Sequence, residues 1–217
     1  MAKTEAFDTF TDAYDEWFDR HPAFYHLELE AVRGLIPPVG ARGMEVGIGS
    51  GKFAVPFGVK IGVDPSEKMA EKARLLGIDV CRSVAEALPF RAGVFDFVLM
   101  VTTICFVDDI LATFREAARV LKREGSIIVG FVDKLSELGR RYAAHREGSR
   151  FYREATFFTT AEVMEYLREA DFDTVEIKQT LIPGGLPGTV EDGFGKGAFI
   201  AIKAVKRGDP ADRKACL

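Results

Sequence analysis

Cysteine, histidine and long apolar runs are all scarce in this sequence, and each scarcity excludes a class of protein. The three cysteines are odd in number and lack the spacing of zinc ligands, so we expect neither a disulfide framework nor a zinc site; they are Cys81, Cys105 and Cys216. The three histidines form no cluster, so no metal site built by the protein is expected. No window approaches the roughly 20 apolar residues of a membrane span, and no signal peptide is recognisable. We therefore expect a cytoplasmic protein in a reducing environment, without a membrane partner.

The sequence also lacks an excess of basic residues. Lysine and arginine number 29 against 33 aspartates and glutamates, which gives a formal net charge of −4. General nucleic-acid binders usually have a clearly basic domain, so a nucleic-acid partner is not expected. The length of 217 residues and the hydrophobic content of 47% suit one domain with a full core, residues 1–217. Neither number indicates an oligomeric state.

Two kinds of segment alternate between residues 40 and 132. Short apolar runs rich in valine and isoleucine occupy residues 43–47, 59–63, 79–83, 95–101 and 126–132. Continuous apolar runs of this length are typical of parallel strands that are buried on both faces. The segments between them have helical spacing. The sequence therefore predicts an α/β fold with a doubly wound sheet.

Helix boundaries are indicated at three places. Pro65 is favoured at a first helical position, so a helix is expected to begin there. A second helix over 108–124 is expected to end before Gly125. Thr159 and Glu162 have the spacing of a capping box at the start of a third helix.

The C-terminal part contains two more strand-like runs, over residues 174–180 and 198–205. The linker between them, residues 181–197, is rich in glycine and proline. Such a linker is either a mobile flap or an inert loop, and the sequence favours neither.

The sharpest motif is a run of three alternate glycines, Gly47, Gly49 and Gly51, after the first predicted strand. Glycines let the backbone turn tightly and let a ligand approach the main chain, and the N–H groups of a following helix would face that ligand. A dinucleotide-binding loop would instead have its third glycine at Lys52. It would also not place a carboxylate, Glu45, beside a pyrophosphate. A carboxylate there suits a cationic ligand such as S-adenosylmethionine, although a generic tight turn stays open.

Two further segments fit the same ligand. Asp64 ends the second predicted strand, where an acid can accept hydrogen bonds from both ribose hydroxyls. The alternative is that Asp64 only caps the helix at Pro65. Residues 83–90 could lay backbone groups along an adenine edge while Leu88 covers the adenine face, or could form an ordinary loop.

In this order, the segments resemble class I S-adenosylmethionine-dependent methyltransferases, and within them the ubiquinone/menaquinone-biosynthesis branch. The resemblance implies a Rossmann-like, mostly parallel seven-stranded sheet with an antiparallel last strand inserted beside its neighbours. It also implies an N-terminal helical cap (1–36), a cofactor-binding core (40–132), a substrate-side insertion (133–172) and C-terminal strands (173–206). The motifs are 45–51, 62–66, 85–90, 95–98 and the entry segments 7–8 and 14–17.

The resemblance also implies which residues bind S-adenosylmethionine. Glu45 and the glycines would border its methionine part, Asp64 would take the ribose, and the tyrosines of the cap would close over it. The carbonyl at the end of the fourth strand would meet the methionine ammonium. The expected set is Tyr14, Tyr25, Glu45, Gly47, Ile48, Gly49, Gly51, Asp64, Pro65, Ser66, Met69, Ala85, Glu86, Ala87, Leu88, Val101 and Thr102.

Three departures from the family pattern stand out. Val84 occupies a position where many relatives have an aspartate that contacts the adenine. Cys105 and Phe106 stand where relatives often have a histidine pair, so an acid–base role for those histidines does not transfer. The stretch 51–59 is short and contains Pro56, so the first crossover helix should have only one or two turns.

Methyl transfer from a sulfonium is an in-line displacement with a neutral leaving group, so it needs positioning and exclusion of water more than an acid catalyst. We expect a small-molecule acceptor: an amine, a quinone-like ring or another metabolite. Candidates for a base are Tyr14, His145 and Asp133. The acceptor pocket is expected between the aromatic-rich cap and the aromatic-rich segment after the fifth strand. Arginines in that segment form either a solvated helix face or a site for an acidic substrate or RNA.

Three other functions remain open from the sequence. One is methylation of protein or RNA, which would need an extended basic surface or a recognition domain. Another is a non-catalytic module that binds the cofactor without turnover. The last is an NAD-linked oxidoreductase, which the glycine spacing disfavours.

Overall fold

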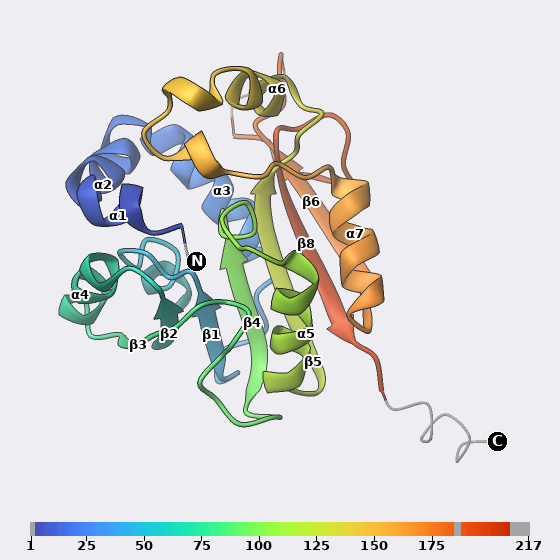
Figure 1. The fold of residues 1–217 in the computed structure, drawn as a ribbon. Helices are drawn as coiled ribbons and strands as arrows, with labels where there is room; N and C mark the ends of the chain where they lie inside the picture. The colour runs from blue at the N-terminus through green and yellow to red at the C-terminus, as the bar shows by residue number, and fades with distance from the viewer. Residues whose placement is uncertain (1–2, 185–187, 209–217) are drawn as a thin grey trace.

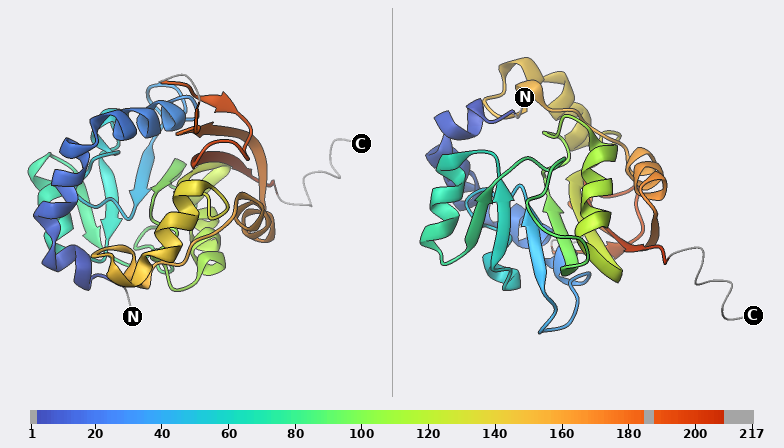
Figure 2. Two further views of the ribbon diagram at one scale, coloured as in Figure 1. Left: turned by 90° about the horizontal axis from the view of Figure 1, so that it is seen from above. Right: turned by 60° about the horizontal axis from the view of Figure 1, so that its bottom comes forward.

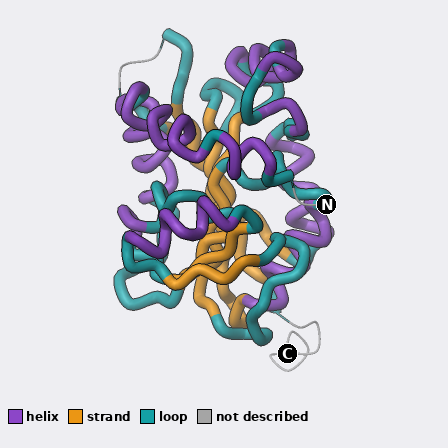
Figure 3. The backbone as a smooth tube through the Cα atoms, turned by 60° about the vertical axis from the view of Figure 1, so that its left-hand side comes forward, coloured by secondary structure: helices purple, strands orange, loops and turns teal. Residues whose placement is uncertain are grey.

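The computed structural model describes residues 3–184 and 188–208, and these form one eight-stranded sheet between layers of helices (Figure 1). The tube in Figure 3 shows the strands between helices of both layers. The strands are β1 (Gly43–Val46), β2 (Ile61–Asp64), β3 (Asp79–Arg82), β4 (Phe95–Val101), β5 (Leu121–Val132), β6 (Phe172–Thr180), β7 (Glu191–Asp192) and β8 (Phe199–Lys206).

The strand order is β3-β2-β1-β4-β5-β8-β6-β7, with parallel pairing from β3 to β5. β8 is inserted between β5 and β6 and runs antiparallel to both, which confirms the predicted position of the last strand. The predicted count of seven strands omits β7, a two-residue edge strand that pairs antiparallel with β6. β7 comes from the predicted linker 181–197, where two polar residues give no strand signal. Residues 185–187 of that linker lie outside the described part.

The α-helices are α1 (Glu5–Thr9), α2 (Thr11–Arg20), α3 (Pro22–Arg33), α4 (Glu67–Leu75), α5 (Ile110–Val120), α6 (Glu137–Ala144) and α7 (Thr160–Glu169) within the described ranges. The core lies in two clusters, one on each face of the sheet. α5 and α7 contribute apolar side chains to one cluster, and α2, α3 and α4 contribute to the other. Burying both faces of β4 and β5 explains why their sequences are continuous apolar runs rather than alternating ones.

Two predicted helix boundaries are wrong. The helix predicted from Pro65 begins at Glu67, because Ser66 is its N-cap and its hydroxyl accepts the amide of Met69 at 3.2 Å. The helix predicted to end before Gly125 ends at Val120, and the chain enters β5 directly at Leu121, which pairs with Phe95. By contrast, the capping box of Thr159 and Glu162 is present in full at the start of α7.

The crossover after the glycine loop is as short as predicted but is not α-helical. Its helical part is a 3-10 helix of three residues, η1 (Val55–Phe57), which ends at Gly58 with a φ of 68°. Pro56 within this turn has no amide hydrogen to continue an α-helix. The glycine loop is therefore followed by turns.

The carboxyl ends of β1, β2, β4 and β5 lie beneath two helical segments (Figure 1). One is the N-terminal cap of α1, α2 and α3. The other contains α6 and two 3-10 helices, η2 (Arg146–Gly148) and η3 (Tyr152–Glu154). Seen from above, the two segments lie around the strand ends (Figure 2, left). Among the described residues, no helix has the length and apolarity that a membrane crossing requires.

Candidate active site

The glycine loop after β1 is held in a left-handed conformation that only glycine adopts easily. Gly47, Gly49 and Gly51 have φ values of 68°, 55° and 86°. The amides of Gly47 and Ile48 both donate to the carbonyl of Val63, at 2.9 and 3.0 Å. These two amides therefore donate to another part of the protein. This differs from the expectation that the N–H groups at a helix start would face a ligand. What the loop offers to a ligand is the bare surface of its backbone.

The absence of side chains on this loop keeps a cavity open. A Cβ added to Gly49 would lie 3.4 Å from the hydroxyl oxygen of Tyr14, and one added to Gly47 would lie 2.4 Å from the methyl carbon of Thr103. Gly47, Gly49 and Tyr14 all line one cavity beneath the cap. A close approach of a ligand to the main chain thus explains why glycine occupies both positions.

Asp64 ends β2 beside this loop. Its Oδ2 accepts the amide of Gly49 at 2.8 Å, and its Oδ1 accepts the amide of Ser66 at 2.9 Å. The side chain is buried but lines the cavity, and burial raises its pKa to about 6. Each carboxylate oxygen keeps a further lone pair, so the group can accept hydrogen bonds from a pair of hydroxyls in the cavity. Helix capping is the role of Ser66, so it does not account for Asp64.

Glu45 lies beneath the loop with 1% of its surface exposed. Its Oε2 has no hydrogen-bond partner among the described residues. Burial first, and the nearby charge of Asp64 second, raise its pKa well above the usual range. An unpartnered buried carboxylate oxygen is costly, and a cationic ligand nearby would reduce that cost.

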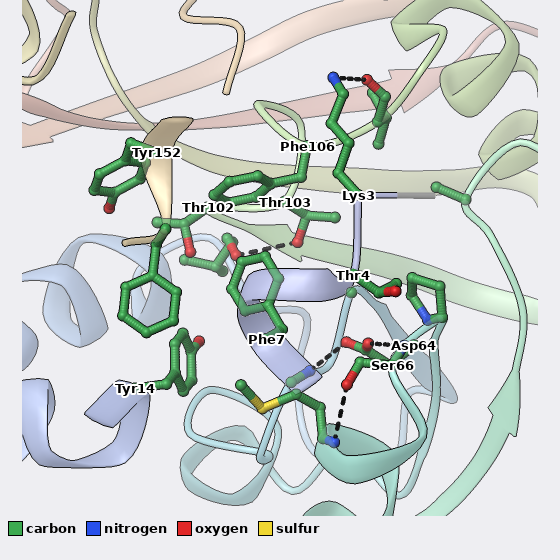
Figure 4. Close-up of a pocket in the computed structure, with 18 of the residues that line it drawn as sticks. Lys3, Thr4, Phe7, Tyr14, Asp64, Ser66, Thr102, Thr103, Phe106 and Tyr152 are labelled. Atoms are coloured by element: carbon green, nitrogen blue, oxygen red, sulfur yellow. Dashed lines mark hydrogen bonds between the residues drawn. The ribbon is translucent and has the colours of Figure 1, made fainter. Parts of the chain in front are cut away.

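The N-terminal cap closes over the cavity and is tied to the loops below it. The hydroxyl of Ser66 donates to Oδ1 of Asp8 at 2.6 Å, and the hydroxyl of Ser50 donates to Oδ1 of Asp15 at 2.5 Å. Figure 4 shows Phe7 and Tyr14 of the cap, with Asp64 and Ser66 on one side of the pocket and Tyr152 on the other. The ring of Phe7 meets that of Phe106 edge-on, with 4.9 Å between centroids.

The end of β4 forms another wall of the cavity. Thr102 has a φ of 53°, which is unusual for a β-branched residue, and it lies in the pocket beside Thr103 (Figure 4). The hydroxyl of Thr103 donates to the carbonyls of Val46 and Val101, at 3.0 and 3.1 Å. These bonds join the ends of β1 and β4 where the cavity opens. Strained backbone of this kind is frequent at functional sites.

Most of the residues expected to bind the cofactor converge on this cavity. Those that line it are Tyr14, Gly47, Gly49, Asp64, Pro65, Ser66, Met69, Ala85, Glu86, Val101 and Thr102. Val84, which replaces the expected aspartate, lines it as well. Glu86 is held there because its Oε1 accepts the amides of Asp108 and Asp109, at 2.7 and 3.1 Å.

Six of the expected residues do not line the cavity. Glu45 lies below it, Ile48 packs against Gly62, and Gly51 faces the side chain of Ile78. Their positions follow from the loop, which turns these residues toward the sheet and α4. The other three are Tyr25, Ala87 and Leu88.

Tyr25, Ala87 and Leu88 lie away from the cavity for three different reasons. The hydroxyl of Tyr25 donates to the carbonyl of Lys52 outside the pocket. Ala87 is on the exposed side of its turn, and Leu88 is buried in the core, where its amide donates to Glu116 at 2.8 Å. Leu88 thus lies in the core and not in the wall of the cavity.

The three candidate bases have different surroundings. Tyr14 lines the cavity, and burial first and the charge of Glu45 second raise the pKa of its phenol. Both oxygens of Asp133 accept hydrogen bonds, Oδ1 from the amide of Leu135 and Oδ2 from the amide and hydroxyl of Thr160. His145 is exposed and does not line the cavity. The hydrogen bonds of Asp133 hold the start of α7.

The remaining wall of the cavity is aromatic. It combines Trp17 and Phe24 of the cap with residues of the segment after β5, which are Leu138, Tyr142, Phe151 and Tyr152. The arginines of that segment, Arg140, Arg141, Arg146, Arg150 and Arg153, are all exposed, and none lines the cavity. They form the solvated face of the segment. Among the described residues, no three histidine, cysteine or acidic side chains are placed to hold a metal ion.

Sequence reasoning missed Glu28 of α3. Its side chain is buried and lines the same aromatic part of the cavity. A signal existed in the sequence, because Glu28 follows Tyr25 by three residues and precedes Val32 by four. These spacings put an acidic residue on the apolar face of a helix.

A glycine-lined cavity at the carboxyl ends of β1, β2 and β4, with an acid at the end of β2, defines a nucleotide-type ligand site in an α/β sheet. Comparison with known proteins agrees. The model of the methyltransferase domain family matches residues 44–129. A solved structure from Thermotoga maritima, a SAM-dependent methyltransferase described as a possible histamine N-methyltransferase, is 46% identical with a TM-score of 0.89. The match covers 94% of this chain and 100% of that one.

Two curated relatives extend the comparison. An uncharacterized protein of Methanocaldococcus jannaschii is 41% identical over 92% of this chain and 98% of its own length. A ubiquinone biosynthesis O-methyltransferase of Xanthomonas axonopodis is 26% identical over 80% of this chain and 82% of its own length, which agrees with the predicted resemblance. The chain belongs to the S-adenosylmethionine-dependent methyltransferases, and its sheet is the Rossmann-like methyltransferase fold.

The residues in the cavity fit the cofactor of this family. The bare backbone at Gly47 and Gly49 leaves room that a Cβ would fill. Asp64 offers acceptors for a diol, and Glu45 has an unpartnered oxygen beneath the loop. The protein is therefore an enzyme that uses S-adenosylmethionine, and the acidic side chains of Asp64 and Glu45 suit a cationic nucleoside.

Proposed function

We propose that the enzyme methylates a small molecule that lies in the aromatic part of the cavity, beside the cofactor. The observation that supports this most directly is the continuity of one cavity. The same cavity is lined by Asp64 and Gly49 on the side of the sheet and by Trp17 and Tyr142 from the two helical segments above it. Both segments would have to move to admit a folded macromolecule, whereas a small molecule fits the enclosed space.

On the cofactor side, the chain's residues bind and orient. S-adenosylmethionine supplies, when bound, a methyl group on a positively charged sulfur. Asp64 would accept hydrogen bonds from the ribose hydroxyls, and Gly47 and Gly49 would let the methionine part approach the main chain. Val84 and Ala85 would form an apolar wall for the adenine. Glu45 would contribute negative charge from beneath the loop.

On the acceptor side, the cap excludes water. Phe7, Tyr14 and Phe151 form a cluster in which each pair of rings lies between 5.6 and 6.1 Å apart, measured between centroids. A dry, shaped site favours in-line displacement, because the reaction disperses charge and needs alignment above all. No proton has to be supplied to a neutral thioether leaving group, so the site needs no acid catalyst.

The names of two relatives support a small acceptor. One is described as a possible histamine N-methyltransferase and another as a ubiquinone biosynthesis O-methyltransferase. The alternative acceptor is RNA or protein. The exposed arginines of the segment after β5 are the feature that favours it, but they lie outside the cavity.

Calorimetric titration tests the cofactor site. S-adenosylmethionine and its demethylated product should bind the wild-type protein, and NAD should not. Asp64→Ala removes the acceptor of the amides of Gly49 and Ser66 as well as the diol acceptor, so affinity should fall at least tenfold. Asp79→Ala at the exposed start of β3 is the matched control and should bind normally. NAD binding, or equal affinity in all three proteins, would contradict the assignment.

A methyl-transfer assay tests the acceptor class. Labelled S-adenosylmethionine should label members of a metabolite panel that contains amines, phenols and quinols, and should leave tRNA and total protein unlabelled. Labelling of tRNA or protein with none of the metabolites would overturn the proposal.

A further inference from the structure

Glu28 is a buried acid inside the cavity. It lies on α3 with 5% of its surface exposed, and it lines the pocket. Its carboxyl group makes no hydrogen bond or ion pair with any residue that the structure describes. Burial raises the pKa of this carboxyl group to about 8. A buried carboxyl group in this state needs a ligand, or it costs stability.

The groups around Glu28 come from three elements and are aromatic. Tyr14 of α2, Tyr142 of α6 and Tyr152 of η3 line the same cavity as Glu28. Burial first, and the charge of Glu28 as a smaller cause, raise the pKa values of these three phenols. Trp17 and Phe24 contribute further rings to the same wall. Among the described residues that line the cavity, the one basic side chain is Lys3, whose ammonium group donates to the carbonyl of Val107 at 3.3 Å and not to Glu28.

A single acid enclosed by aromatic rings is selective for positive charge. The negative faces of aromatic rings attract a cation, and a carboxylate pairs with it directly. An anionic acceptor would be repelled by Glu28. A neutral phenol or quinol would leave the carboxyl group without a charged partner.

We propose that the methyl acceptor is a primary or secondary amine, bound as its ammonium ion by Glu28. The proposal rests on the proposed function, since it names the substrate class for the aromatic part of that cavity. Glu28 would be the residue that distinguishes an amine from a ring alcohol of the same shape. The rings of Trp17 and Tyr142 would hold the body of the amine.

The same carboxyl group can make the amine reactive. An ammonium nitrogen has no lone pair and cannot attack carbon. When Glu28 takes one proton, an N–H bond breaks, an O–H bond forms, and the electron pair remains on nitrogen as the nucleophile. Charge is conserved, because a carboxylate and an ammonium become a carboxylic acid and a neutral amine. Burial raises the pKa of Glu28 to about 8, closer to that of an amine, which makes this transfer easier.

Binding of matched probes tests the proposal without turnover. The probes are 2-phenylethylamine, the neutral 2-phenylethanol and the anionic 3-phenylpropanoate, with butylamine and butanol as an aliphatic pair. Each is titrated calorimetrically into the protein, with and without the demethylated cofactor product. The amines should bind at least tenfold more tightly than their matched alcohols, and the anion should not bind.

The variant Glu28→Gln keeps the size of the side chain and removes its charge. It should lose the preference for amines, with affinity reduced about tenfold or more. Glu30→Gln is the matched control on the same helix, because Glu30 is partly exposed and pairs with Arg33 at 3.1 Å. Equal binding of amine and alcohol by the wild type, or an unchanged amine preference in Glu28→Gln, would overturn the proposal.

The pH dependence of binding gives a second readout. The pKa of Glu28 in the free protein is about 8, so its carboxyl group carries a proton below that pH. An alkylammonium ion keeps its proton to about pH 10. Amine affinity should therefore rise between pH 6 and pH 8 and level off above that, and it should be flat in Glu28→Gln. A flat profile in the wild type would contradict the pairing. If amines show no preference while the demethylated cofactor product binds normally, the amine proposal fails and the cofactor assignment stands. If that product does not bind, the proposed function fails.

Discussion

The amide of Gly49 donates a hydrogen bond of 2.8 Å to Oδ2 of Asp64, and this bond joins the glycine loop after β1 to the end of β2. The acid therefore has two roles in one place. It fixes the loop in the conformation that leaves the cavity open, and it presents lone pairs to that cavity. Sheet register sets the distance, because β1 and β2 pair in parallel with Val46 opposite Val63.

We expect Gly49→Ala to impair cofactor binding far more than stability. The added methyl group would lie 3.4 Å from the hydroxyl of Tyr14, in the space that the cofactor needs. The left-handed φ of 55° would add about 1 kcal/mol of strain. Gly93→Ala is the matched control, because Gly93 has a φ of 69° and nothing within 4 Å of the added Cβ.

Urea unfolding and calorimetry with the demethylated cofactor product separate these effects. Both variants should lose about 1 kcal/mol of stability, and only Gly49→Ala should lose affinity, by tenfold or more. Equal losses of affinity in the two variants would contradict the assigned cavity.

The hydrogen bond between Ser66 and Asp8 should control how the cap opens. Asp8→Ala removes the acceptor of a 2.6 Å bond that ties α1 to the start of α4. The cofactor product should dissociate faster, and the amides of α1 and α2 should exchange hydrogen faster, while the core amides stay protected. Asp12→Ala is the control, since Asp12 is exposed and its partner Lys72 keeps a second ion pair with Asp15 of the same helix. If both variants release the product at the wild-type rate, the cap is not held by this bond.

Asp133→Asn should destabilise the protein without affecting its ligands. The carboxylate accepts three hydrogen bonds, from Leu135 and from the amide and hydroxyl of Thr160. In the variant, the NH2 group of the amide would face N–H or O–H groups that now donate to a carboxylate oxygen. Losing those hydrogen bonds should reduce the free energy of unfolding by about 1–3 kcal/mol. Urea unfolding should show the loss, and titration with the cofactor product should give the wild-type affinity. Reduced turnover with unchanged stability would instead indicate a role for Asp133 as a base.

The buried Glu28 should make the protein less stable as the pH rises. Its pKa is about 8 in the folded chain and near 4.5 when unfolded, so the folded state binds more protons between these values. The contribution of Glu28 to the free energy of unfolding is therefore fully present below about pH 4.5 and is lost as the pH rises toward 8. Glu28→Gln should be more stable than the wild type at pH 8, by on the order of 1–3 kcal/mol, and nearly equal at pH 5. Urea unfolding of both proteins at the two pH values measures this difference, and a gap independent of pH would contradict it.

Much of the fold could be predicted because its signals are local. The buried strands β4 and β5 are continuous apolar runs, and the capping box at Thr159 is a complete four-residue pattern. Where a boundary depends on tertiary pairing, local signals fail. Gly125 was predicted to end a helix, but Leu121 is drawn into the sheet opposite Phe95. β7 has no apolar pattern, because it forms by pairing with one edge of β6.

The cofactor side of the cavity was predictable for the same reason, since its residues lie next to strand ends. The direction in which each side chain points was not predictable in this way. Leu88 and Ile48 stand in the expected segments, yet both point into the core. Glu28 could not be assigned a role from sequence, because its surroundings are made by Tyr142 and Tyr152, which are distant along the chain.

Fluorescence of Trp17 tests most directly whether one cavity holds both the cofactor and an amine. It is the only tryptophan in the sequence, and it lines the cavity. Titration with 2-phenylethylamine should change its emission saturably, both in the free protein and in protein saturated with the demethylated cofactor product. A saturable change in both cases would mean that the amine and the cofactor product bind in neighbouring parts of one cavity. Mutual displacement, or an emission that the amine leaves unchanged, would contradict the account.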